Sequence, residues 1–202
     1  MTEITKILYW ISTGLMVPVI VLLLIFFIRA LLLIGTFYSS YISKLRFNKQ
    51  LLQVWDELSA ENVREKLQEH QLPERHNAAI YLEKALKSIP DETHFNKILN
   101  DFEIVCQKEI AGSQTLAKLG PILGLMGTLI PMGPALVGLA SGDISSMASN
   151  MQVAFATTVI GLLIGAVGFI ILQVKKRWMA ADINNLEFVL ELLKQAPKKK
   201  LA

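Results

Sequence analysis

The hydrophobic residues of the chain gather in three long runs, at residues 7–38, 119–139 and 151–174. Arg29 is the one charged residue within these runs. A helix needs roughly 20 residues, at about 1.5 Å per residue, to cross a hydrocarbon core near 30 Å thick. Each run reaches that length, so the pattern predicts an all-α membrane protein with three transmembrane helices.

Outside the runs, apolar residues recur with helical spacing, and Pro73 and Pro90 interrupt the pattern. No helix breaker stands between Phe95 and Gly112, which predicts one long helix that passes from water into the second span. The expected organisation is a first transmembrane helix with its inner extension at 1–43, a helical cytoplasmic domain at 44–118, a second transmembrane helix at 119–139, an outer loop at 140–150, a third transmembrane helix at 151–174, and a cytoplasmic C-terminal helix with a basic tail at 175–202.

Lysine and arginine predict the orientation of the spans, because they accumulate on the cytoplasmic side of a membrane. They follow the first run at 44–49, precede the second at 108–118 and follow the third at 175–177, whereas the stretch 140–150 has none. The N-terminus is therefore expected outside and the C-terminus inside. The first run lacks a basic start and a cleavage site, so we interpret it as a retained anchor and not as a signal peptide.

Tyr9 and Trp10 predict an aromatic anchor at the outer face, and Arg29 then lies at the depth of the inner headgroups. The simplest interpretation is that Arg29 extends its guanidinium to the inner interface. The alternative is a buried ion pair with a carboxylate of this or another chain. In the first case residues 30–37 continue as an apolar helix that needs protein cover, which favours an oligomer; otherwise the span shifts inward to about residues 14–35.

Composition excludes several other classes of protein. The chain is 52% hydrophobic with a mean hydropathy of +0.44, too apolar for a disordered chain. Cys106 is the single cysteine, which excludes a disulfide framework and predicts a small buried hydrophobic residue. Residues 44–118 hold 11 Lys and Arg beside 12 Asp and Glu, a net −1, so no nucleic-acid partner is expected. The lipid bilayer is an expected partner.

Known catalytic and cofactor motifs do not occur in the sequence. His70, His76 and His94 stand in separate polar contexts without metal-ligand spacing. No phosphate-binding loop, nucleophile elbow or confined carboxylate pair is present. We therefore expect no catalytic residue, no metal and no cofactor, and a protein that is not an enzyme.

Small residues form one narrow face on each of the last two runs. On the third run they recur at spacings of 4, 3, 4 and 3, and on the second at 3, 4, 3 and 4. Each face carries a threonine, which either bonds the carbonyl one turn back or lines a narrow polar path that could also receive a partner helix. The two sets are Ala154, Thr158, Gly161, Gly165 and Gly168, and Pro121, Gly124, Thr128, Pro131 and Ala135.

Two segments at these residues resemble the MotA/TolQ/ExbB proton channel family. Pro121-Ile-Leu-Gly124-Leu-Met-Gly127-Thr128 is similar to the family's Pro-x-x-Gly-Leu-x-Gly-Thr segment. Ala154-Phe-Ala-Thr-Thr158-Val-Ile-Gly161-Leu162 is similar to its Ala-Leu-x-Ala-Thr-Ala-x-Gly-Leu segment. The expected layout of three spans with the N-terminus outside resembles the TolQ/ExbB branch.

The resemblance implies a homopentamer in the inner, or plasma, membrane that surrounds a dimeric single-span partner of the ExbD/TolR/MotB type. The partner's membrane aspartate would be protonated and released, Thr128 and Thr158 would line the path, and proton flow would drive mechanical work for transport or envelope processes. The residues themselves support one part of this expectation. Residues 119–139 and 151–174 contain no ionisable side chain, so a proton-binding carboxylate must come from elsewhere.

The chain also departs from the family pattern. Ile130-Pro131 replaces Trp-Gly, Val153 stands where an acidic residue is common, and Val167 replaces a proline. These departures indicate a divergent member with another partner or ion, and Thr157 beside Thr158 leaves the path residue ambiguous by one position. The competing hypothesis is a non-conducting membrane scaffold that recruits a cytoplasmic protein. A secondary transporter fits less well, since repeated halves are missing.

Overall fold

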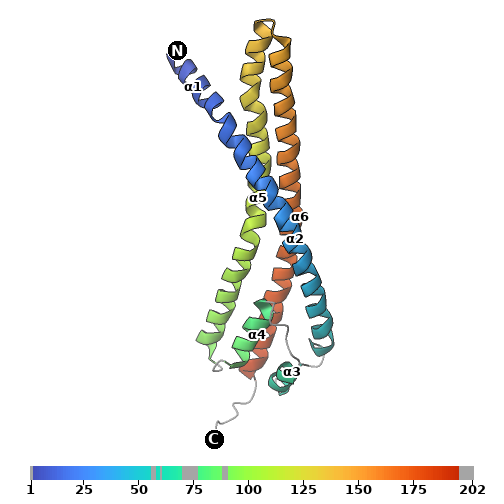
Figure 1. The fold of residues 1–202 in the computed structure, drawn as a ribbon. Helices are drawn as coiled ribbons and strands as arrows, with labels where there is room; N and C mark the ends of the chain where they lie inside the picture. The colour runs from blue at the N-terminus through green and yellow to red at the C-terminus, as the bar shows by residue number, and fades with distance from the viewer. Residues whose placement is uncertain (1, 56–57, 60, 70–76, 88–90, 196–202) are drawn as a thin grey trace. The chain divides into compact units, whose positions relative to one another are not determined.

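The computed structural model describes residues 2–55, 58–59, 61–69, 77–87 and 91–195. These residues form six α-helices, and none of them is in a strand (Figure 1). Three of the helical stretches are long and apolar enough to cross a membrane, which confirms the predicted fold class. The helices are α1 (Thr2–Gly14), α2 (Met16–Trp55), α3 (Val63–Glu69), α4 (Asn77–Lys87), α5 (Glu92–Ala140) and α6 (Ile144–Gln195).

The chain divides into two compact units. Unit 1 consists of Met1–Gly35 and Ala111–Gln173, and unit 2 of Thr36–Ile110 and Val174–Ala202. Each of the three long helices contributes its apolar run to unit 1 and its more polar extension to unit 2. The long helix predicted to run from residue 95 into the second span is α5, which is continuous through Gly112.

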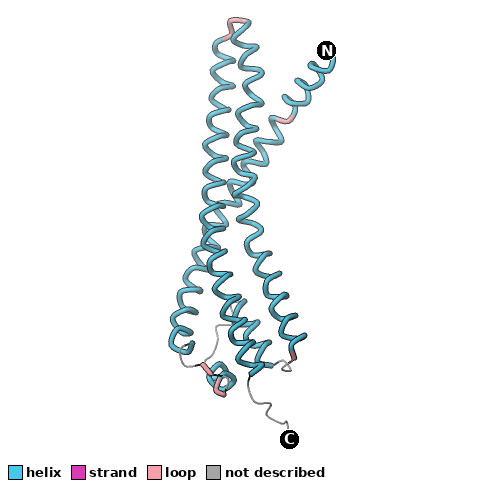
Figure 2. The backbone as a smooth tube through the Cα atoms, turned by 180° about the vertical axis from the view of Figure 1, so that it is seen from behind, coloured by secondary structure: helices cyan, strands magenta, loops and turns pink. Residues whose placement is uncertain are grey.

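The first apolar run is divided at Leu15, which lies in a turn between α1 and α2 (Figure 2). Pro18 explains the division, since proline has no N–H to donate to the carbonyl of Gly14, whereas its fixed φ suits the first turn of α2. Leu15 instead donates its N–H to the carbonyls of Ile11 and Ser12, both at 3.1 Å. The hydrophobic pattern alone did not predict this division.

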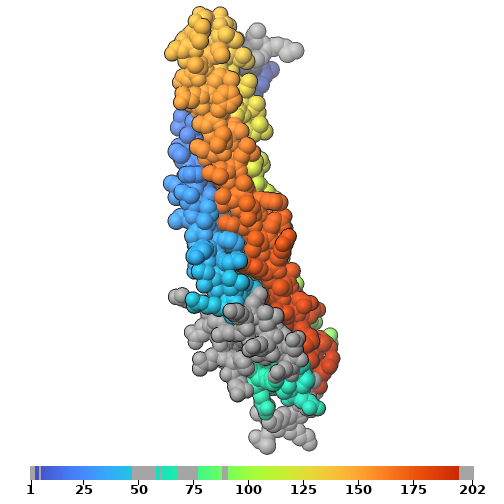
Figure 3. All heavy atoms as spheres, turned by 90° about the vertical axis from the view of Figure 1, so that its right-hand side faces the viewer, coloured from blue at the N-terminus to red at the C-terminus, as the bar shows by residue number. Residues whose placement is uncertain are grey.

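In unit 1, α2 packs against the hairpin formed by α5 and α6, and α2 and α6 lie side by side (Figure 3). The buried residues of α5 are spaced by seven, which is the repeat that keeps one face of a helix toward its neighbours over several turns. Because lipid is as apolar as these side chains, close packing and not burial from water stabilises this contact. The buried cluster is Val19, Leu23, Ala30, Leu116, Leu123, Ile130 and Ile164.

The turn between α5 and α6 is shorter than the loop expected at 140–150. It occupies residues 141–143, so residues 144–150 are already helical. Gly142 adopts a φ of +75°, which favours glycine. The Asp143 carboxylate accepts the N–H of Ser146 at 3.0 Å and so caps the first turn of α6.

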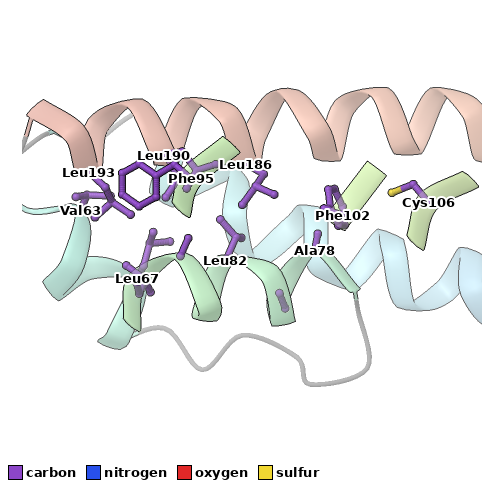
Figure 4. Close-up of a cluster of buried hydrophobic side chains, with 14 residues drawn as sticks. Val63, Leu67, Ala78, Leu82, Phe95, Phe102, Cys106, Leu186, Leu190 and Leu193 are labelled. Atoms are coloured by element: carbon purple, nitrogen blue, oxygen red, sulfur yellow. The ribbon is translucent and has the colours of Figure 1, made fainter. Parts of the chain in front are cut away.

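Unit 2 has its own hydrophobic core, in which side chains from α3, α4, α5 and α6 point toward one another (Figure 4). The apolar residues that recur with helical spacing outside the three runs supply this core, as the sequence pattern predicted. Pro73, Pro90 and the basic tail lie outside the described residues. The core residues are Val63, Leu67, Ala78, Ala79, Leu82, Ala85, Leu86, Phe95, Phe102, Cys106, Leu186, Val189, Leu190 and Leu193.

A buried ion pair joins α2 to α6 within unit 2. The Lys44 ammonium donates to the Asp182 carboxylate, and the two side chains are only 5% and 8% exposed. Nearby, Phe37 stacks on Trp178 with ring centroids 5.5 Å apart. A buried charge is costly unless it is paired, so Lys44 and Asp182 stabilise each other within the folded unit.

Cys106 is buried in the core of unit 2, as the sequence analysis predicted for this single cysteine. It lies before the apolar run of α5, outside the membrane-spanning segment expected there. Burial raises the pKa of its thiol to about 12, and the nearby carboxylates of Glu109, Asp182 and Glu103 add to the shift. At pH 8 only about one thiol in ten thousand is then the reactive thiolate.

We therefore expect N-ethylmaleimide at pH 8 to label Cys106 in the folded protein at least about a hundredfold more slowly than in the protein denatured in dodecyl sulfate. Mass spectrometry of intact protein over a time course measures both rates. Equal rates in the two states would show that the thiol is accessible and ionisable, contrary to the structure.

Candidate functional site

The hairpin of α5 and α6 brings two helix backbones into direct contact through glycines. A Cβ atom placed on Gly161 would lie 2.5 Å from the Cα of Gly124 and 2.7 Å from the carbonyl oxygen of Gly120. Only glycine fits such a separation, because the obstructing atoms are backbone and cannot rotate away. Gly120 was not among the predicted packing residues, although it stands one turn before Gly124 on the same face.

The same face continues along both helices. The ring of Pro121 occupies the space beside Gly165, where a Cβ would lie 2.5 Å from the proline Cγ. A Cβ on Gly168 would lie 2.5 Å from the backbone nitrogen of Ala117. Ala154 is 3% exposed near the start of α6. The predicted small residues of the third run thus include three glycines that touch α5.

Thr157 faces α5 and is buried, with 6% of its surface exposed. Its hydroxyl donates toward the carbonyls of Ala154 and Val153, at 2.9 and 3.0 Å. A Cβ on Gly127 would lie 2.5 Å from the Thr157 hydroxyl oxygen, so the side chain of Thr157 fills the space that Gly127 leaves open. The contact between Gly127 and Thr157 fixes the rotation of α6 against α5 at this level.

Thr128 directly follows Gly127, and Thr158 directly follows Thr157. Each threonine therefore points about 100° around its helix axis from the contact between Gly127 and Thr157. Both are partly exposed, in contrast to Thr157. The Thr158 hydroxyl donates to the carbonyl of Ala154 at 3.0 Å, and that of Thr128 to the carbonyl of Leu125 at 2.7 Å. Each hydroxyl oxygen keeps lone pairs that can accept a hydrogen bond from water or a hydronium ion.

Arg29 is exposed on α2, next to Ala30, which is buried in the core of unit 1. Within the described part of the chain no carboxylate forms an ion pair with it. The choice between the interface position and an ion pair with a carboxylate of this or another chain stays a prediction.

No group of three His, Cys, Asp or Glu side chains that could hold a metal occurs among the described residues. His70 and His76 lie outside them. The His94 ring nitrogen Nδ1 lies 3.1 Å from the Asp91 carboxylate at the exposed start of α5. That side-chain hydrogen bond is the main cause that lowers the pKa of Asp91, which suits the residue preceding a helix.

These observations define a multi-pass α-helical membrane protein, with a glycine-packed hairpin whose two apolar runs carry hydroxyls and no ionisable side chain. The model of the MotA/TolQ/ExbB proton channel family matches residues 43–187. The chain therefore belongs to this family, and the match includes all of α5 and α6 as far as residue 187. No individual curated protein matches the sequence.

Proposed function

We propose that this protein is the ring-forming subunit of a proton-driven motor of the TolQ/ExbB type in the inner, or plasma, membrane. Five copies, with N-termini outside and C-termini inside, surround a dimeric single-span partner that carries a membrane aspartate. Proton flow along this assembly drives mechanical work for transport or envelope processes. The observation that carries the proposal is the family match over residues 43–187, which includes the apolar runs of both hairpin helices.

In this proposal, Thr128 and Thr158 line the ion path. Their partial exposure supports this role, because each hydroxyl lies off the contact between α5 and α6 and remains available to a neighbour. Thr157 is assigned to packing, because it is buried against Gly127. Of Thr157 and Thr158, the proposal therefore places Thr158 in the path. The proton-binding carboxylate belongs to the partner, since no acid occurs in 119–139 or 151–174.

The membrane potential is large enough to drive such a motor. One charge that crosses 100 mV releases roughly 2.3 kcal/mol, so a proton that crosses about 150 mV releases about 3.5 kcal/mol. That energy exceeds the cost of breaking a typical hydrogen bond in the hairpin, about 1 kcal/mol net. A single proton can therefore shift the balance between two packed arrangements of the ring and its partner.

A second candidate function is a non-conducting scaffold that recruits a cytoplasmic protein. One observation favours it: both threonine hydroxyls already donate to carbonyls of their own helices, as purely structural threonines do. The scaffold needs the packing of the hairpin and the surface of unit 2, but it needs no partner in the membrane and no hydroxyl in a path.

The mass of the detergent-extracted complex tests the proposal. We expect native mass spectrometry of the chain, expressed with its neighbouring gene, to give an assembly near five times 22.5 kDa plus two copies of a single-span protein. Expression without that gene is expected to give the pentamer alone. A monomer or dimer that acquires no single-span partner would contradict the motor and leave the scaffold.

A further inference from the structure

Unit 2 contains a pocket of about 460 Å³, a volume typical of small-molecule sites. Four helices, α2, α4, α5 and α6, contribute its walls, and its apolar lining includes Phe102, Ile110 and Met179. Neither the hairpin packing nor the proposed ion path uses this pocket.

The polar groups of the pocket carry balanced charge. Lys175 contributes a cation and Glu109 a carboxylate, while Asp182 is already paired with Lys44. The Asn77 amide donates to the Glu109 carboxylate. The carboxylate oxygens have further lone pairs that can accept other hydrogen bonds. A ligand that carries one negative and one positive group therefore matches the pocket better than a simple anion or cation.

Several hydrogen-bond donors of the pocket can form more hydrogen bonds than they make in the structure. The Lys175 ammonium makes one long bond, 3.5 Å to the backbone carbonyl of Glu109, although an ammonium has three N–H groups. Within the described part of the chain the hydroxyls of Ser39 and Ser43 have no hydrogen-bond partner. Donors grouped with a lysine are suited to the oxygens of a phosphate.

The position of the pocket along the helices points to a lipid as the source of that phosphate. Ser39 directly follows the apolar run of α2, and Lys175 directly follows that of α6. Trp178, which also lines the pocket, packs against Phe37 and Tyr41 at centroid distances of 5.5 and 5.8 Å. Aromatic and basic side chains gather in this way at membrane–water boundaries.

We propose that this pocket binds the headgroup of a zwitterionic aminophospholipid from the adjacent leaflet. The phosphate contacts Lys175 and the hydroxyls of Ser39 and Ser43, and the primary amine donates to Glu109. Basic pockets at the membrane surface of helical proteins bind lipid headgroups by the same chemistry. The inference concerns unit 2 and holds whether or not ions pass through the ring.

Lipid titrations of the delipidated full-length protein, followed by native mass spectrometry, test the proposal. We expect phosphatidylethanolamine to bind at least about tenfold more tightly than phosphatidylcholine, whose choline has no N–H, or phosphatidylglycerol, which has no amine. Soluble glycerophosphoethanolamine is expected to bind far more weakly, because the bilayer no longer holds the headgroup at the pocket. Equal affinity for the three lipids, or tighter binding of the soluble compound, would overturn the proposal.

Two substitutions and a matched control locate the site. Lys175→Met is expected to weaken phosphatidylethanolamine binding about tenfold, whereas Lys176→Met, an equal charge change at the exposed neighbouring position, leaves it unchanged. Glu109→Gln is expected to remove the preference for phosphatidylethanolamine over phosphatidylcholine while binding of both persists. An equal loss in the two lysine variants would show general attraction of lipid to positive charge, and would also overturn the proposal.

Discussion

Replacement of Thr158 by valine is expected to lower proton flux at least about tenfold and to leave assembly intact. Valine keeps the shape of threonine but has a methyl group in place of the hydroxyl. The proposed path therefore loses one hydrogen-bonding group. The measurement is acidification of proteoliposomes that contain the subunit with its co-purified partner, under an imposed potential. Native mass spectrometry of the same sample checks that the complex is intact.

Thr157→Val is the matched control, because it makes the same chemical change at the neighbouring position. Thr157 is only 6% exposed and lies against Gly127, so its hydroxyl is not available to a path, and the proton flux of this variant is expected to stay near that of the unmodified protein. If Thr158→Val conducts normally while Thr157→Val does not, the assignment of the two residues is reversed. Normal flux in both variants would remove hydroxyls of this helix from the path.

Gly161→Ala is expected to destabilise the hairpin by about 3 kcal/mol, near the upper end of the usual cost of overpacking. The added methyl group would meet Cα of Gly124 and the carbonyl of Gly120, and neither atom can move unless the helices separate. For a chain of this length the loss corresponds to a Tm lower by about 6–12 °C. Tryptophan fluorescence of the detergent-solubilised protein during heating measures it.

Gly112→Ala is the control for this second prediction, since no heavy atom lies within 4 Å of a Cβ at Gly112. Alanine is also the better helix former, by about 1 kcal/mol, so the Tm should stay equal or rise. Gly124→Ala is expected to fall between the two, because its Cβ would lie 3.1 Å from the Cα of Gly161. A Tm that drops equally for all three variants would contradict the role assigned to the contact.

The hairpin could be predicted from sequence because its signal is local. Glycine, alanine and proline at spacings of three and four mark one face of a helix, and the structure places Gly124, Gly161, Gly165 and Gly168 in close contact with the opposite helix. Spacing alone could not separate Thr157 from Thr158, because either residue could face the neighbouring helix. The contact with Gly127, which lies on the other helix, distinguishes them.

Other features depend on residues far apart in the chain, and no periodicity reports them. The ion pair of Lys44 with Asp182 and the pocket between four helices appear only when α2, α4, α5 and α6 pack together. The break at Leu15 had a local signal in Pro18, but the continuous hydrophobicity of the first run outweighed it. Apolar patterning thus predicts which segments are helical and apolar, but not how residues on separate helices meet.

The buried ion pair also sets an order of events during synthesis. Lys44 and Asp182 are 138 residues apart, so a ribosome that adds about 5–20 residues per second makes the aspartate roughly 7–28 s after the lysine. Until then the nascent chain lacks the carboxylate of Asp182, so the contact between Lys44 on α2 and Asp182 on α6 cannot form. Unit 2 therefore closes around this ion pair only after synthesis has passed Asp182.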